Sequence, residues 1–144
     1  MKTNSELRTL AHGVKTLYPQ VHTVFEMGGE TSKYIRLGEI AGSDRVVMLD
    51  YQSSSECAAG TGSFIDQQAS RLLCHVQDVG RAACSAPCAA RVAGRCSVFA
   101  KTDMVHAQQM GYTPEQILRG LCEAVARNFK SNIVKGRRVI PCGP

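Results

Sequence analysis

Cys57 stands at the head of a run of small residues that could support thiol chemistry. Two alanines and two glycines follow it before Ser63, so the backbone there can pass close to a bulky group. The next residues are typical of a helix, which Thr61 or Ser63 can cap. Because a helix start favours negative charge, the pKa of this thiol should fall. The pattern suits a reactive thiol, a metal ligand or an anion-binding loop; a buried cysteine in a tight glycine turn is the simpler alternative.

A second stretch joins a predicted strand to a pair of glycines. The apolar residues from Val21 to Met27 predict a strand, and Gly28 and Gly29 follow directly. Glycine lets backbone N–H groups crowd an anion, as a phosphate loop requires. On its own, a glycine pair after a strand more often marks a hairpin, so both interpretations stay open here.

Three stretches of the chain resemble three motifs of one known family. They are CAAGTGSF at residues 57–64, GRCSVFAKTD at residues 94–103 and EMGGETSKY at residues 26–34. Together they are similar to the ATP-dependent activators of 2-hydroxyacyl-CoA dehydratases and to the ATP-binding subunits of benzoyl-CoA reductases. The resemblance runs from about Tyr18 to Lys135, which is nearly the whole chain.

The resemblance implies an α/β fold of the acetate and sugar kinase, Hsp70 and actin type (ribonuclease H-like), in which two related halves enclose ATP. We expect residues 1–144 to form a single partial ATPase domain with a long C-terminal helix. It corresponds to the central part of the family domain, without the N-terminal phosphate motif and the C-terminal adenosine motif. We therefore expect weak or absent ATP hydrolysis from this chain alone.

The resemblance also implies an iron–sulfur centre held by Cys57 and Cys96. A [4Fe–4S] cluster normally takes four thiolates, so two cysteines per chain favour a homodimer that shares one cluster on its two-fold axis. ATP and Mg²⁺ are the other implied cofactors. We expect their binding residues to be Gly28, Gly29, Glu30, Ser32, Lys33, Gly60, Thr61 and Gly62.

The implied function is that of an ATPase-type activator. ATP hydrolysis in the intact family drives a low-potential electron onto a dehydratase or reductase partner. No catalytic residue is assigned. The chain departs from the family at Thr31, where an acidic or amide residue is usual. Glu30 offers a replacement, because a carboxylate can serve a hydrated Mg²⁺.

Two other classes of function remain open. The spacing of Cys84 and Cys88 admits a zinc or thiol module completed by Cys96 or Cys74, although no second cysteine or histidine pair completes a usual zinc pattern. An inactive remnant that folds without activity is the other alternative. Outside such a module, the five cysteines other than Cys57 and Cys96 are predicted to be ordinary thiols: Cys74, Cys84, Cys88, Cys122 and Cys142.

Composition excludes several classes of partner. The net charge is +5 with scattered basic residues, and the chain has no Trp, so a nucleic-acid groove is not expected. No apolar run is long enough to span a bilayer and no signal-peptide pattern opens the chain, which predicts no membrane partner and a cytoplasmic location. Seven cysteines, an odd number, agree with the reducing cytoplasm.

Hydrophobic periodicity predicts the elements that position these residues. We expect a helix over 4–17, strands over 21–27, 32–37 and 46–51 as an antiparallel meander, and a helix after Cys57. A further helix is predicted over 101–110, and residues 74–93 are predicted to be less regular. Thr113, Pro114 and Gln116 form a capping box that starts the longest predicted helix, which ends near Lys135 and Gly136.

Overall fold

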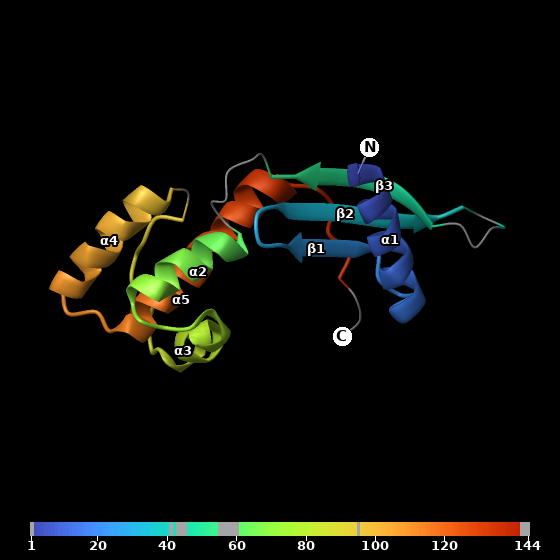
Figure 1. Ribbon diagram of the computed structural model, residues 1–144. Coiled ribbons are helices and arrows are strands. Elements are labelled where there is room, and N and C mark those ends of the chain that lie inside the picture. Colours follow the sequence, from blue (N-terminus) through green and yellow to red (C-terminus); the bar gives the residue numbers. More distant parts are fainter. Residues whose placement is uncertain (1, 41, 43–45, 55–60, 95, 142–144) are drawn as a thin grey trace.

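The structure, a computed structural model, describes residues 2–40, 42, 46–54, 61–94 and 96–141. A three-stranded sheet with one helix forms one part, and a group of helices forms the other (Figure 1). The elements are α1 (Lys2–Leu17), β1 (Thr23–Met27), β2 (Ser32–Glu39), β3 (Val46–Ser53), α2 (Gly62–Arg71), η1 (Val76–Asp78), α3 (Val79–Ser85), α4 (Ser97–Gln109), α5 (Pro114–Asn128) and η2 (Phe129–Val134).

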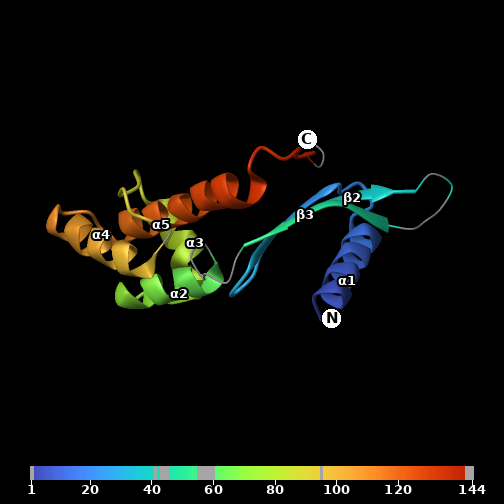
Figure 2. The ribbon, with the colours of Figure 1, turned by 90° about the horizontal axis from the view of Figure 1, so that it is seen from above.

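The sheet is an antiparallel meander in the order β1-β2-β3. Strand β2 lies in the centre. Its residue Lys33 is paired with Glu26 of β1 on one side and with Ser53 of β3 on the other. Since side chains alternate along a strand, Ile35 and Leu37 face α1, where they pack with Leu7 and Ala11. Figure 2 shows α1 against this face of the strands.

The opposite face of the sheet carries the end of the long helix. Tyr34 of β2 is fully buried against Phe129 and Ile133. The rings of Phe25 and Phe129 meet edge to face, with centroids 5.1 Å apart. The Tyr34 hydroxyl donates a hydrogen bond of 2.5 Å to the carbonyl of Arg138, which ties the C-terminal segment to the same strand. The sheet is therefore covered by helices on both faces.

The second core lies among α2, α3, α4 and α5. Its buried apolar residues form one cluster around α5, and these are Phe64, Ala69, Val79, Ala83, Ala90, Val92, Ala100, Met104, Ala107, Ile117, Leu118, Leu121 and Val125. The segment after α3 crosses α5 closely, where the N–H of Ala90 donates to the carbonyl of Gln116 and the Arg119 side chain donates to the carbonyl of Ala86. Helix α5 thus contacts both parts of the fold.

The structure confirms most of the predicted elements. The meander is present, and Thr113 and Gln116 form the predicted reciprocal capping box at the start of α5. The helix continues through the π-helical turn η2 and ends at Lys135, which has a left-handed backbone. This agrees with the predicted end near Lys135 and Gly136.

Three predictions about helices were wrong in detail. Helix α1 begins at Lys2, two residues before the predicted start at residue 4. Helix α4 begins at Ser97, several residues before the predicted start at Lys101, and Cys96 is its N-cap residue. The region predicted to be irregular contains η1 and α3. None of the described helices is both long and apolar enough to cross a membrane.

The close contact at Gly120 gives a test of the packing of α5. A Cβ atom at this position would overlap the carbonyl oxygen of Ala90, whereas a Cβ at Gly80 in α3 would meet no atom within 4 Å. We expect Gly120→Ala to lower the free energy of unfolding by about 1–3 kcal/mol. Gly80→Ala is the control and should leave stability unchanged or raise it by up to about 1 kcal/mol. Urea denaturation measures both, and equal effects of the two variants would contradict this packing.

Candidate functional site

The hairpin loop between β1 and β2 has two exposed residues, Gly29 and Glu30. It spans residues 28–31, and the N–H of Gly28 donates to the carbonyl of Thr31 at 2.8 Å. The next N–H groups, those of Gly29, Glu30 and Thr31, have no acceptor in the part of the chain that the structure describes. Consecutive backbone N–H groups of this kind form anion-binding concavities. The loop can therefore hold an anion such as a phosphate group.

The two glycines of this loop differ in how much room they leave for a side chain. A Cβ at Gly28 would lie 2.7 Å from Oε1 of Glu26 and 3.1 Å from the carbonyl oxygen of Thr31, so a side chain there would displace its neighbours. At Gly29 a Cβ would meet only the hydroxyl of Ser63, at 3.8 Å, which is an ordinary contact. Gly29 is also exposed, so a side chain could be added there with little change to the loop.

The carbonyl groups of the same loop bind the start of α2. The N–H of Gly62 donates to the carbonyl of Gly28 and the N–H of Ser63 to the carbonyl of Gly29, both at 2.9 Å. The Ser63 hydroxyl donates to the carbonyl of Gly29 as well, at 2.5 Å. We call this set of contacts, between Gly28 and Gly29 on the loop and Gly62 and Ser63 on α2, the loop–helix clasp. The N–H of Gly62 is occupied within it, so Gly62 contacts a phosphate only if this bond breaks.

Two predicted binding residues lie at the base of the loop with their side chains buried. Ser32 is 3% exposed, and its backbone exchanges hydrogen bonds with Ser54 through the Ser54 hydroxyl and the Ser54 N–H. Thr61 is 1% exposed and is the N-cap residue of α2. Both positions support the loop and the helix start, and Ser54 was missed by sequence analysis because its partner lies on another strand.

Lys33 lies behind the loop, between two carboxylates. Its Nζ is 3.1 Å from Oε1 of Glu6 in α1 and 3.1 Å from Oε2 of Glu26 in β1, and its side chain is only 7% exposed. Burial acts to lower the pKa of Lys33, but the hydrogen bonds to Glu26 and Glu6 outweigh it and raise the pKa above its ordinary value. The charge of Lys33 is therefore neutralised within the fold.

Cys96 lies at the start of α4 with its side chain half-buried. It is a free thiol, and the next residues of the helix, Val98 and Phe99, are each 67% exposed. Cys57 and Gly60, the other predicted residues of the metal and loop sites, lie outside the described residues. The structure thus brings Gly28, Gly29, Glu30, Ser32, Thr61 and Gly62 together around one loop.

The cysteines proposed for a zinc module do not come together. Among the described residues, no group of three or more His, Cys, Asp or Glu side chains is close enough to hold a metal ion, and this covers Cys84, Cys88 and Cys96. The sulfur of Cys88 instead accepts a hydrogen bond from the side-chain amide of Gln116 at 3.0 Å. Burial raises the pKa of the Cys122 thiol, and the nearby Cys84 adds to this shift.

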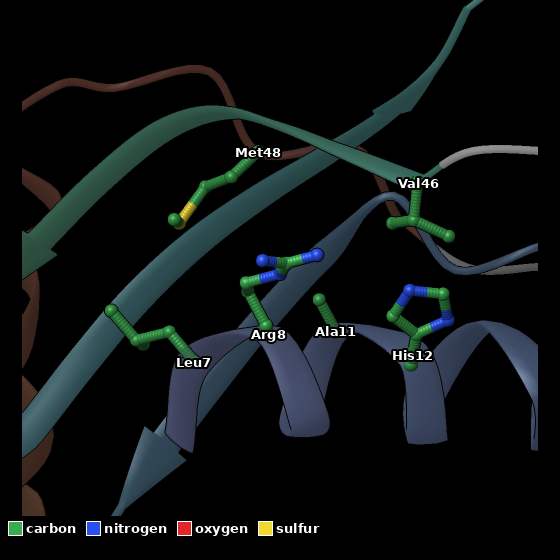
Figure 3. Close-up of a pocket in the computed structure, with 6 residues that line it drawn as sticks. All are labelled: Leu7, Arg8, Ala11, His12, Val46 and Met48. Carbon is green, nitrogen blue, oxygen red and sulfur yellow. The ribbon is translucent and has the colours of Figure 1, made fainter. Parts of the chain in front are cut away.

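A groove of about 440 Å³ lies between α1 and β3, away from the predicted site residues (Figure 3). It is lined by Leu7, Arg8, Ala11, His12, Val46 and Met48. Figure 3 shows the Arg8 and His12 side chains rising from α1 toward β3. Sequence analysis gave no signal for this groove, because its walls come from segments that meet only in the folded chain.

A sequence profile of one protein family matches residues 1–140 of the chain. The chain belongs to the BadF/BadG/BcrA/BcrD ATPase family. It is 30% identical over 125 residues to the (R)-2-hydroxyglutaryl-CoA dehydratase activating ATPase of Acidaminococcus fermentans, covering 87% of this chain and 46% of that protein. It is 28% identical over 115 residues to a subunit of the benzoyl-CoA reductase of Thauera aromatica, covering 80% of this chain and 39% of that protein.

Solved structures of this ATPase family have the same fold. The activator of the 2-hydroxyisocaproyl-CoA dehydratase from Clostridium difficile, with bound ADPNP, superposes with a TM-score of 0.82 at 27% identity, over 94% of this chain and 48% of that one. The A. fermentans (R)-2-hydroxyglutaryl-CoA dehydratase component A superposes with a TM-score of 0.78 at 27% identity, over 90% of this chain and 48% of that one. The predicted actin-like ATPase fold is confirmed, and the chain spans about half the length of these relatives.

The environment of Lys33 predicts a dependence of stability on pH. Because its folded-state pKa lies above the ordinary value of 10.5, the charged form stabilises the fold fully below pH 10.5, and this contribution is lost as pH rises through the folded-state pKa. We expect Lys33→Met to lower the free energy of unfolding by about 1–3 kcal/mol at neutral pH. The difference from wild type should shrink above pH 10.5.

Urea denaturation between neutral pH and strongly alkaline pH checks this prediction. Lys130→Met is the matched control, since Lys130 is exposed and has no ion pair among the described residues. A difference between Lys33→Met and wild type that stays constant across the alkaline range would show that the loss comes from packing and not from the charge.

Proposed function

We propose that the hairpin loop of residues 28–31 binds the phosphates of a nucleotide and that the chain belongs to an ATPase that activates a CoA-ester dehydratase or reductase. One observation carries this proposal: N–H groups without an acceptor among the described residues lie at the Gly-Gly loop of a chain that superposes on an activator with bound ADPNP. The similarity to an activating ATPase and to part of a benzoyl-CoA reductase supports the same class of partner.

Phosphate binding at this loop would depend on the backbone and not on a lysine. Lys33 already serves Glu6 and Glu26, so it adds little net positive charge at the loop. Glu30 is exposed beside the loop N–H groups, and Glu26 lies next to Gly28. Two carboxylates near an anion site favour Mg²⁺ as the bridging cation, because Mg²⁺ in such sites is held by one or two carboxylates together with substrate phosphates.

Gly29 offers a direct test of nucleotide binding. Gly29→Val should leave the fold intact, since a Cβ there meets only the Ser63 hydroxyl at 3.8 Å, but its branched side chain adds bulk to the residue whose N–H group would bind the phosphate. We expect it to weaken the binding of ADPNP with Mg²⁺ by at least about tenfold, the loss that a few phosphate contacts represent. Isothermal titration calorimetry measures the affinity.

Gly13→Val is the control for this test, because Gly13 is exposed in α1 and has no atom within 4 Å of a Cβ position. It should bind as wild type does. Equal affinities of Gly29→Val and wild type would move the phosphate site elsewhere, and no binding by the wild-type chain would remove the proposal for this chain.

We further propose that Cys96 and Cys57 hold an iron–sulfur cluster shared by two copies of the chain. The thiol of Cys96 fits such a group: it is free, half-exposed, and lies at the start of a 13-residue helix whose dipole favours a bound anion. A thiolate is the donor that these clusters prefer. When bound, the cluster supplies a one-electron carrier for the partner enzyme. The two cysteines of one chain provide half of the four ligands, which supports a two-fold homodimer.

Metal analysis under anaerobic conditions tests this assignment. Reconstitution of the wild-type chain with iron and sulfide should give about two irons per chain, and the Cys57→Ala, Cys96→Ala double variant should lose them. The matched control is Cys84→Ala, Cys88→Ala, which should retain the iron because these exposed thiols lie in no metal-binding group among the described residues. Full iron in the Cys57→Ala, Cys96→Ala variant would refute the assignment. If the wild-type chain instead bound zinc without iron, and only the Cys84→Ala, Cys88→Ala variant lost that zinc, the zinc or thiol module would be favoured.

A further inference from the structure

Helix α2 begins without a side-chain cap of its own. Its N-cap residue, Thr61, makes no capping hydrogen bond to the first turn. The first N–H groups of the helix, those of Gly62 and Ser63, instead donate to the carbonyls of Gly28 and Gly29 in the hairpin loop. The helix start is therefore capped by a different part of the chain, and the cap is the loop that presents N–H groups to solvent.

The bonds of this clasp and the solvent-facing donors belong to the same peptide groups. The carbonyl of Gly28 and the N–H of Gly29 share one peptide plane, and the carbonyl of Gly29 and the N–H of Glu30 share the next. No peptide bond among the described residues is cis, and in a trans peptide the C=O and N–H point in opposite directions. With both carbonyls directed at α2, the N–H groups of Gly29 and Glu30 point away from it.

From this geometry we infer that the two peptide groups couple ligand binding at the loop to the first turn of α2, and that Ser63 is the positioning residue of this coupling. The inference rests on the proposed nucleotide site. An anion that accepts the N–H groups polarises each peptide, which makes its carbonyl a stronger acceptor for α2. Any rotation of a peptide plane that improves the hydrogen bond from its N–H to the ligand also moves the carbonyl that accepts from α2.

Ser63 is the side chain that strengthens this coupling. Its hydroxyl gives the carbonyl of Gly29 a second donor, at 2.5 Å, beside the backbone N–H at 2.9 Å. Ser63 is otherwise exposed, so the residue can be changed without opening the core. Because residue 62 is a glycine, the start of α2 can lie close to the hairpin loop. A Cβ at this position would lie 3.4 Å from both the carbonyl oxygen of Gly28 and the Cα of Gly29.

NMR of the intact chain tests the inference, since it reports each amide separately. ADPNP with Mg²⁺ should shift the N–H signals of Gly29 and Glu30 and slow hydrogen exchange at Gly62 and Ser63 by about twofold to tenfold, the change expected for strengthening one hydrogen bond. In Ser63→Ala, binding at the loop should persist, but the slowing at Gly62 and at position 63 should fall to less than about half of the wild-type effect.

Two further variants separate positioning from a merely structural role. Ser63→Thr keeps the hydroxyl and should restore the nucleotide-dependent slowing. Ser70→Ala changes an exposed serine at the other end of the same helix, whose hydroxyl makes no hydrogen bond with the described residues, and should behave as wild type. The readout is the difference that the nucleotide makes within each variant, which a general loss of helix stability would not alter.

The outcomes are distinguishable. Binding that shifts Gly29 and Glu30 without changing exchange in α2 would overturn the coupling and leave the proposed function standing. A Ser63→Ala chain that responds as wild type does would overturn the role of Ser63. Absence of any shift at Gly29 and Glu30 in the wild-type chain would instead reject the nucleotide site, and the inference with it.

Discussion

The hydrogen bonds from the start of α2 to the carbonyls of Gly28 and Gly29 join the two parts of this fold. A three-stranded meander with one helix has a small core, formed by Leu7, Ala11, Ile35 and Leu37 with their partly buried neighbours. The meander is held from one end by these bonds and from its second face by the contact of Tyr34 with Phe129. Both contacts lead into the helical core, so the position of the loop is fixed by the helices as much as by its own strands.

In the proposed phosphate site, this arrangement would leave binding to the backbone. A lysine side chain can neutralise phosphate directly, but Lys33 of β2 is bound by Glu6 of α1 and Glu26 of β1. The loop itself keeps its carbonyls on the α2 side and its N–H groups on the open side. In the proposed site, a cation at Glu26 or Glu30 would compensate the charge of a bound phosphate, and the backbone N–H groups would orient it.

Local signals in the sequence predicted the local features of the fold. The capping box at Thr113 and the glycine pair after β1 depend on neighbouring residues, and both are confirmed. Helix α4 was placed too late because Val98 and Phe99 have strand-like propensities, and the position of its start depends on tertiary packing. The residues next to Lys33 in the sequence do not indicate its burial between two carboxylates, because these carboxylates belong to two other elements. The resemblance to the family indicated the loop, whereas the clasp that holds it required the folded chain.

Helix α4 gives independent support for a partner at Cys96. Its inner face packs through Ala100, Met104 and Ala107, yet the outward Val98 and Phe99 are also apolar and are each 67% exposed. A helix whose outer face remains in water normally carries polar residues there. The exposed pair lies in the first turn, beside the half-exposed thiol, so the same contact that brings a second cysteine pair to a shared cluster would cover it. The chemistry of the thiol and the hydrophobic effect therefore favour the same surface for association, and neither observation depends on the other.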